Sequence, residues 1–386
     1  MNMHCRRFLI LLFALALGTP DRALARFYIP QLEQVPVSRL INNLERQVRE
    51  QPGRYGPQLN LARAHAMAYA LDNDRAHVTV TKGAMSLYEG HLFPWEYRAQ
   101  FWEKSAPQSL DARARAHLAR AIKLYAAILQ SSAVETPGLA LARLGHGWCS
   151  EQAGDKQTAI EDYRTLLKDV TLDEWHNTEF EAAEYLVALL DPGRDAAEIA
   201  LLGNMRGLYR QRLGSIPPFQ TPIAIPLDRA TPLAEIEDKS ARVGFDVDPH
   251  HAGQHWSWIT PKAGWLAYNP KKTGKVVSGI RLFGNVSYWM FWDNGYQAMS
   301  ALDDNGDGVL SGKELDGLVV WVDANGNGVC DPRELKSLAE LNIKALSYSH
   351  LLMPGHPDHI VYAPTGVHYN NGTTGPSYDL ILQSKP

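Results

Sequence analysis

Apolar positions recur with a helical period through the first half of the chain. Leu40, Leu44 and Val48 lie on one face of a helix, and the segment 59–71 is rich in alanine, which favours helix formation. Residues 73–111 are less regular and rich in aromatic side chains, whereas the segment 112–129 returns to the helical pattern. This pattern predicts an all-helical region from about Val37 to Leu213.

The pattern changes after residue 214. The proline-rich segment 215–222 (SIPPFQTP) cannot continue a helix and is predicted to be a linker. Short apolar runs bounded by turn residues follow it, and they predict strands at Ile223–Leu227, Arg242–Val247, Trp256–Ile259 and Trp265–Tyr268. One further helix is expected from about Asn294 to Leu302. The predicted fold class is therefore α+β.

Within the helical region, residues 139–167 resemble a tetratricopeptide repeat. Gly147, Gly154, Ala159 and Tyr163 have the spacing with which two antiparallel helices pack through small residues while one large side chain fills the gap. A second Ala/Tyr pair, Ala121/Tyr125, lies 38 residues upstream, whereas that repeat has a period of 34. The resemblance is loose, and an ordinary helical bundle is the alternative. Helices at 174–190 and 195–213 would cap such a stack.

The N-terminus has the pattern of a secretory signal. Arg6 and Arg7 precede the apolar run Phe8–Leu17, and the run is followed by an A-x-A cleavage pattern at residues 23–25. The run is too short to span a bilayer comfortably, and no lipobox cysteine follows it. We expect cleavage after Ala25, a periplasmic or secreted location, and no stable membrane insertion of the mature chain.

Charge and cysteine content add two constraints. Residues 1–25 contain three arginines and one aspartate, so their removal changes the formal charge from −4 to −6. An acidic exported protein does not fit nucleic-acid binding. Cys149 and Cys330 remain, and they could form a disulfide or stay as two separate thiols. The length of 386 residues favours two or three domains.

The most informative motifs are two twelve-residue stretches, 303–314 (DDNGDGVLSGKE) and 323–334 (DANGNGVCDPRE). Ca²⁺ is coordinated by about seven oxygens, and an EF-hand-type loop supplies them from positions 1, 3, 5, 7, 9 and 12. Glycine at position 6 takes the positive φ of the chain reversal. The pattern predicts two calcium ions, with these ligands: Asp303, Asn305, Asp307, the carbonyl of Val309, Ser311 and Glu314; then Asp323, Asn325, Asn327, the carbonyl of Val329, Asp331 and Glu334.

Helix capping is the simpler interpretation of the same residues. Ser311-x-x-Glu314 and Asp331-x-x-Glu334 are both capping boxes. A capping box accounts for positions 9 and 12 but leaves the Asp/Asn pattern at positions 1, 3 and 5 unexplained. The second loop has fewer carboxylates, so we expect it to bind calcium more weakly. Only residues 315–322 separate the two loops, and that is too short for two full helices.

The segment 279–347 resembles a calcium-binding region found in many large exported bacterial proteins. The matching elements are an LFG element at 282–284, Asn294-Gly295 leading a helix, the two DxNG loops, and an LxxLxI-like end at 338–343. The resemblance implies the side-chain ligands named above and a short helix before the LxxLxI end. It also implies earlier acidic turns. Here those turns contain His250, His251, Lys271 and Lys272, so we expect them to have lost their metal.

Three other groups of residues are candidates for functional sites. His250, His251 and His255 could bind a transition metal, but they lack a fixed ligand geometry. Asp246 and Asp248 could act as paired carboxylates, although a spacing of two is ordinary at a strand end. The aromatic runs at 256–268 and 288–292 could form a sugar platform, but aromatic residues more often lie in a core.

Together these patterns predict a signal peptide (1–25), a tetratricopeptide-like helical domain (26–214), a linker (215–222) and a small mixed α/β calcium-binding domain (223–386). The expected function is an exported scaffold whose helical domain binds an unknown protein or peptide and whose calcium is structural. The alternative is a calcium-stabilised hydrolase acting on glycans or another polymer. A calcium sensor is disfavoured, because the short gap leaves little helix to move.

Overall fold

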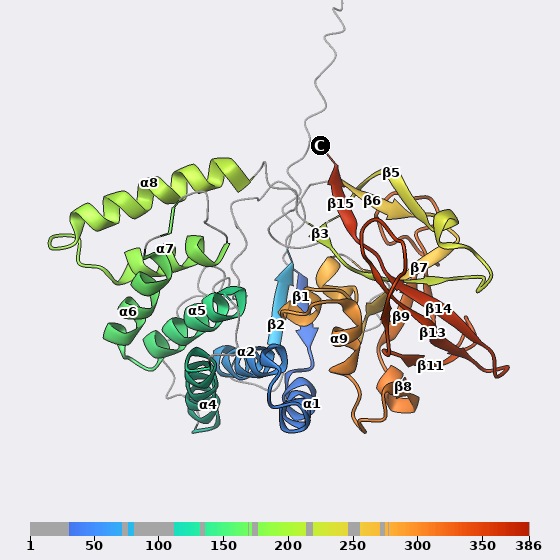
Figure 1. Ribbon diagram of the computed structural model, residues 1–386, viewed down its shortest axis with the longest axis horizontal. Coiled ribbons are helices and arrows are strands. Elements are labelled where there is room, and N and C mark those ends of the chain that lie inside the picture. Colours follow the sequence, from blue (N-terminus) through green and yellow to red (C-terminus); the bar gives the residue numbers. More distant parts are fainter. Residues whose placement is uncertain are drawn as a thin grey trace, which may run out of the picture.

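In the computed structural model, helices build the N-terminal half and antiparallel sheets build the C-terminal half (Figure 1). The structure describes residues 31–71, 76–80, 112–131, 136–168, 170–171, 177–213, 219–245, 255–270, 275–276 and 278–385. The predicted signal peptide and the turns at 246–250 and 271–274 lie outside these residues. The fold is α+β, as the sequence pattern predicted.

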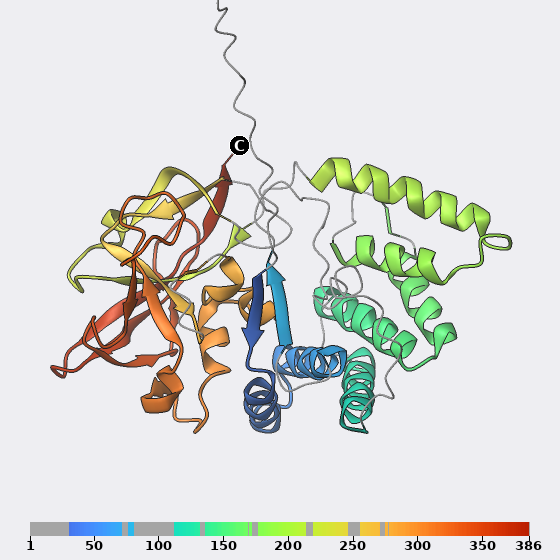
Figure 2. The same ribbon diagram turned by 180° about the vertical axis from the view of Figure 1, so that it is seen from behind.

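The helical half is a succession of helices, each packed on the next described helix of the chain (Figures 1 and 2). Strands β1 (Gln31–Val35) and β2 (Ala76–Val80) pair beside it. The helices are α1 (Val37–Glu50), α2 (Tyr55–Leu71), α4 (Ala112–Leu129), α5 (Thr136–Gln152), α6 (Lys156–Leu167), α7 (Asn177–Leu189) and α8 (Ala196–Leu213). None of the described helices has both the length and the apolar character needed to cross a lipid bilayer.

Two glycines of α5 let aromatic rings of neighbouring helices approach its backbone. A Cβ atom at Gly147 would lie 2.7 Å from Cε1 of Tyr163 in α6, and one at Gly145 would lie 2.7 Å from Cε1 of Tyr125 in α4. Both tyrosine side chains are fully buried. Between α5 and α6 the chain turns at Gly154, whose φ of 88° is in the region that glycine adopts readily.

The sheets of the C-terminal half are antiparallel and curled. In the larger sheet the strands run in the order β10-β9-β7-β4-β14-β13-β11-β8, and β12 pairs with β13; the smaller sheet has the order β3-β15-β6-β5. Their bounds are β3 (Phe219–Gln220), β4 (Ile223–Pro226), β5 (Glu237–Gly244), β6 (His255–Ile259), β7 (Ala263–Tyr268), β8 (Val309–Ser311), β9 (Leu318–Trp321), β10 (Leu335–Ser337), β11 (Ile343–Ser347), β12 (Leu351–Leu352), β13 (Val361–Tyr369), β14 (Thr374–Asp379) and β15 (Leu382–Lys385).

One local expectation is wrong. In place of the short helix before the LxxLxI-like end, β10 pairs with β9 and a turn follows at residues 338–342. The register places Leu335 opposite Trp321, so the pairing satisfies backbone groups that a helix would have satisfied internally. By contrast, α9 (Gly295–Ser300) forms where a helix was predicted, and the Asn294 side chain caps it by accepting from the Gln297 amide at 3.0 Å.

A histidine pair buried between α2 and α4 makes the stability of the helical half depend on pH. The Nδ1 atoms of His65 and His117 lie 2.8 Å apart, so one ring must be neutral and accept the proton of the other. Burial, His117 and Arg120 lower the pKa of His65 to about 4. Burial and Arg113 also lower the pKa of His117.

We expect the helical half to lose stability as the pH falls below about 6.5, the ordinary pKa that His65 regains on unfolding. The unfolded chain then binds a proton that the folded chain excludes, and the loss should reach about 3 kcal/mol near pH 4. The check is a series of denaturant titrations between pH 7 and 4. His65→Leu should flatten the profile, whereas His255→Gln, at the exposed first position of β6, should not. Parallel profiles for wild type and His65→Leu would contradict this assignment.

Candidate metal centre

The two predicted loops lie at opposite ends of the strand order of the larger sheet. The first begins after α9 and runs through β8 into a short 3-10 turn at residues 312–315. The second begins directly after β9 and ends before β10. An extended strand therefore enters the second loop, as the sequence pattern indicated, while the helix α9 precedes the first.

The aspartate at position 1 of each loop is buried, and a side chain from the core reaches it. Asp303 is 0 % exposed, and its carboxylate accepts from the amides of Gly306 (2.6 Å) and Gly308 (3.0 Å) and from the hydroxyl of Tyr348 (2.6 Å). Asp323 is 1 % exposed and accepts from the amide of Gly328 at 2.8 Å and from Nε1 of Trp258 at 2.8 Å. Neither aromatic donor was predicted from the sequence pattern.

The glutamate at position 12 closes each loop from the opposite end. Glu314 accepts from the amide of Asp304 at 2.7 Å and from the amide of Ser311 at 2.9 Å. Glu334 accepts from the corresponding amides, those of Ala324 at 2.8 Å and Asp331 at 3.0 Å. Each glutamate thus joins positions 2 and 9 of its own loop, and both side chains are buried.

The Asp and Asn side chains at positions 3 and 5 form successive turns. In the first loop Asn305 accepts from the amide of Asp307 (2.8 Å), and Asp307 accepts from that of Val309 (2.9 Å). In the second loop Asn325 accepts from the amide of Asn327 (3.1 Å), which accepts from that of Val329 (2.7 Å). The two loops therefore repeat one hydrogen-bond pattern. The side chains at positions 3 and 5 are exposed.

The predicted positive φ angles at position 6 are confirmed. Gly308 has a φ of 88° and Gly328 a φ of 68°. At Gly328 any side chain would also clash, since a Cβ atom would lie 2.6 Å from the carbonyl oxygen of Gly244. Glycine is required there both for the backbone conformation and for the close packing against β5.

Asp303 is held as a carboxylate in spite of its burial. Desolvation opposes ionisation, but the hydrogen bonds from Tyr348, Gly308 and Gly306 and the nearby Arg46 together lower the pKa of Asp303. For Tyr348 the effect is the reverse: burial and its hydrogen bond to Asp303 raise the pKa of the phenol. The loop therefore holds a buried negative charge at neutral pH.

The tryptophans considered as a sugar platform form a core beneath the second loop. Trp256, Trp258 and Trp265 are 0 %, 2 % and 0 % exposed. The Trp258 ring meets Trp265 and Trp321 edge-on, with centroids 5.3 and 5.7 Å apart. Buried rings offer no face to a polysaccharide. Of the three histidines considered as metal ligands, only His255 lies among the described residues, and it is exposed.

Another mixed cluster, not anticipated from the sequence, joins Glu237, His356 and Asp358, with ligand atoms within 4.8 Å of one another. His356 Nδ1 accepts from the Asp358 amide at 3.2 Å, so Nε2 carries the proton and faces Glu237 at 3.3 Å. Lys239 lies 2.6 Å from the Asp358 carboxylate. The ammonium group of Lys239 therefore lies against this cluster, where it would repel a metal ion.

The two cysteines are separate thiols. Cys149 and Cys330 are both buried thiols, so no disulfide joins the two halves through them. Burial raises the pKa of each thiol. Both are therefore protonated and poorly reactive at neutral pH.

Comparison with known proteins gives a family match over the C-terminal half. A family model described as the SPM domain matches residues 227–383, which include both loops. The chain is also 31 % identical over 98 residues to the iron-regulated protein FrpA of Neisseria meningitidis serogroup C. That alignment covers 24 % of this chain and 9 % of the relative, so the chain spans only a small part of the relative's length.

Proposed function

We propose that this protein is an exported calcium-binding scaffold in which two ions stabilise the C-terminal half. The observation that carries the proposal is the repeated loop geometry, in which buried carboxylates at positions 1 and 12 approach each end of a loop. A capping box does not require buried aspartates that take hydrogen bonds from Tyr348 or Trp258. The family likeness over residues 227–383 is compatible with the proposal but names no ligand.

The donor set fits a hard cation. Each loop offers carboxylate, amide and backbone oxygens, which are the ligands that calcium prefers. The second loop also contains Cys330, but this buried thiol stands at position 8, which is not a ligand position of such a loop. A carboxylate that accepts two backbone N–H groups retains lone pairs for an ion. The residues that would hold the first ion are Asp303, Asn305, Asp307, Ser311, Glu314 and the carbonyl of Val309; their counterparts in the second loop are Asp323, Asn325, Asn327, Asp331, Glu334 and the carbonyl of Val329.

Calcium in these loops would be structural. It would neutralise clustered negative charge and so contribute folding free energy to the sheets on which the loops lie. Weak sites of about 10⁻⁴–10⁻³ M would be filled in an extracytoplasmic compartment with millimolar calcium. Export itself is inferred from residues 1–25 of the sequence.

The helical half would serve as the interaction module. We assign it to a tetratricopeptide-like stack because Gly147 and Tyr163 make the small-to-large contact expected of such a repeat. Its partner would be a protein or peptide. The alternative, a glycan hydrolase, is supported less well, because Trp256, Trp258 and Trp265 of its proposed aromatic platform are core residues.

Isothermal calorimetry with calcium alone tests the proposal directly. We expect two binding events for the mature chain, the weaker one lost in Glu334→Gln and the stronger one lost in Glu314→Gln. Asp316→Asn is the matched control, since Asp316 is an exposed acid two residues beyond the first loop. Absence of heat at millimolar calcium would refute the function proposed here.

A further inference from the structure

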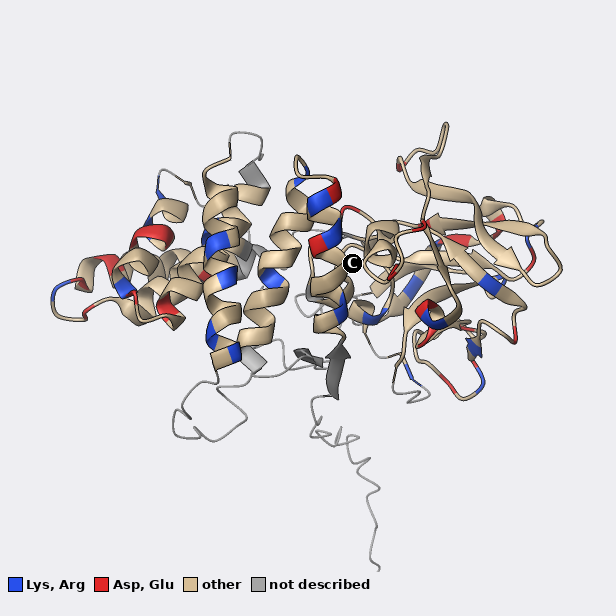
Figure 3. Cartoon of the chain, turned by 90° about the horizontal axis from the view of Figure 1, so that it is seen from below, with Lys and Arg blue, Asp and Glu red and all other residues tan. Residues whose placement is uncertain are grey.

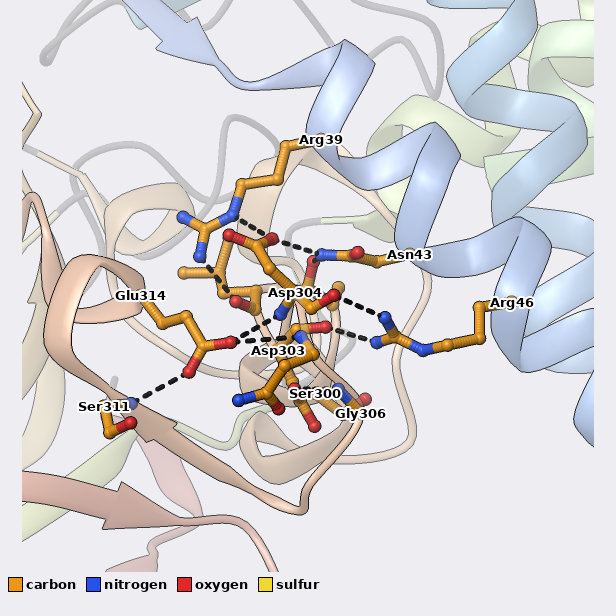
Figure 4. Close-up of polar contacts among 12 residues, drawn as sticks. Arg39, Asn43, Arg46, Ser300, Asp303, Asp304, Gly306, Ser311 and Glu314 are labelled. Carbon is orange, nitrogen blue, oxygen red and sulfur yellow. Dashed lines mark hydrogen bonds and ion pairs between the residues drawn. The ribbon is translucent and has the colours of Figure 1, made fainter.

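One face of α1 contacts residues 300–304, the segment that leads from α9 into the first loop. Arg39, Asn43, Arg46 and Gln47 are spaced so that they share one side of a helix, and all four donate hydrogen bonds to residues 300–304 (Figure 4). Basic positions lie along the helices in the middle of the molecule, where the two halves meet (Figure 3). Helix α1 of one half thus contacts the other half at the start of the first loop, for which calcium binding was proposed above.

The individual contacts are close and partly buried. Asn43 is 3 % exposed, and its amide nitrogen lies 2.9 Å from both the Ala301 carbonyl and the Asp304 carboxylate. Arg39 Nε lies 2.7 Å from the same carboxylate. Arg46 donates to the carbonyl of Asp304 at 2.8 Å and to that of Asp303. Hydrogen bonds to charged groups in such a setting are stronger than neutral ones.

The acceptors that α1 uses are not the oxygens assigned to the ion. They are main-chain carbonyls of residues 300–304 and the side chain of Asp304, at position 2 of the loop. The same short backbone segment presents the Asp303 carboxylate and the Asp304 amide to the inside of the loop. An ion and α1 would therefore hold opposite sides of one backbone segment without competing for atoms.

A second set of contacts joins the helical half to the C-terminal half, between α2 and Phe291. Asn60 of α2 donates to the Phe291 carbonyl at 2.6 Å and accepts from the Phe291 amide at 2.9 Å. The guanidinium of Arg63 lies 4.5 Å from the centroid of the Phe291 ring. Helices α1 and α2 together therefore hold the segment that leads through α9 into the first loop.

We propose that calcium occupancy of the first loop and docking of α1 stabilise each other, so that the ion links the two halves of the chain. The proposal rests on the calcium binding proposed above. An ion orders residues 303–305, and the ordered backbone presents its carbonyls to α1. A docked α1 in turn preorganises the loop for the ion. Coupling of this kind is reciprocal and amounts to 5–150-fold in affinity for typical proteins.

The positive charge of Arg46 on α1 opposes calcium binding to the first loop. Arg46 lies close to Asp303, and a guanidinium there repels a cation. Neutral donors are therefore the appropriate probe, because their removal changes preorganisation and leaves the charge unaltered. Among the described contacts of the second loop, the side-chain partners Trp258 and Trp321 both belong to the C-terminal half. The second loop is thus an internal control.

The first test is calcium calorimetry on the double variant Asn43→Ala/Gln47→Ala. We expect the dissociation constant of the first site to rise about tenfold, a typical coupling, while that of the second site is unchanged. Asn42→Ala is the matched control, because Asn42 is the same residue type on an exposed position of the same helix. Equal affinities in wild type and the double variant would overturn the coupling.

The reciprocal test leaves α1 intact, so it can test the coupling between calcium and α1 even if the double variant does not fold. Hydrogen exchange of residues 37–50 is followed with calcium and with chelator. Exchange in α1 should accelerate in chelator and in Glu314→Gln, but not in Glu334→Gln. Unchanged exchange in a chain that does bind calcium would refute the coupling alone. A wild-type chain that takes up no calcium would refute the proposed function as well.

Discussion

Chelation of calcium is expected to lower the melting temperature of the C-terminal half by roughly 10–20 °C. Each ion that binds only the folded chain contributes about 2.7 kcal/mol when its free concentration is 100 times the dissociation constant. Two filled sites therefore contribute about 5 kcal/mol, and in a domain of this size each kcal/mol corresponds to about 2–4 °C. Melting curves in chelator and at a calcium concentration 100 times the measured dissociation constants, about 10 mM for a site of about 10⁻⁴ M, give the difference.

The position-12 variants assign the effect to each loop. Glu314→Gln should reduce the calcium-dependent shift, and the double variant Glu314→Gln/Glu334→Gln should abolish it. The backbone amides that now donate hydrogen bonds to Glu314 would face the NH₂ group of a glutamine, so the variant also loses stability without calcium. The quantity to compare is therefore the calcium-dependent shift of the melting temperature. Asp316→Asn should behave as wild type. Identical melting with and without calcium would leave the loops as capped turns.

Gly295→Ala is expected to destabilise the C-terminal half by about 3 kcal/mol or more, the upper range for overpacking. Gly295 begins α9, and its amide lies 3.2 Å from the buried Asp379 carboxylate. A Cβ atom there would lie 2.7 Å from Cγ1 of Ile223 and closer still to the carbonyl oxygen of Phe283. A backbone atom in the middle of the core cannot move aside as the end of a flexible side chain can.

The matched control for this variant is Gly56→Ala. Gly56 lies in the first turn of α2, and nothing would come within 4 Å of an added Cβ. There alanine should be neutral or stabilising by up to about 1 kcal/mol, because it favours the helix over the unfolded chain. Denaturant midpoints of both variants, followed by tryptophan fluorescence, provide the comparison. A Gly295→Ala chain as stable as Gly56→Ala would show that α9 does not pack as described.

The elements predicted most successfully were those with strong local signals. Helical periodicity identified α1 and the alanine-rich α2, and Asn294-Gly295 identified the start of α9. The positive φ angles of Gly308 and Gly328 followed from the loop pattern alone. Each of these features depends on neighbours within a few residues, so the local sequence contains the information.

Features that depend on distant residues could not be predicted in this way. The segment after the second loop pairs with β9 as a strand, although the family resemblance implied a helix. Tyr348 reaches Asp303 across 45 residues and Trp258 reaches Asp323 across 65. Neither aromatic residue has a pattern of its own, because a single buried ring that donates a hydrogen bond has the same sequence signature as any core residue.

The sequence by itself determined the α+β class, the place where helices give way to strands, and the spacing of oxygen-bearing side chains in the two loops. Those properties arise from periodicity and from the conformational freedom of single residues. Only the tertiary structure decided which core side chains support the loops and that α1, more than 250 residues earlier, donates to residues 300–304. Such contacts depend on how the two halves pack, and the local sequence of a surface helix or loop does not indicate which distant segment it will contact.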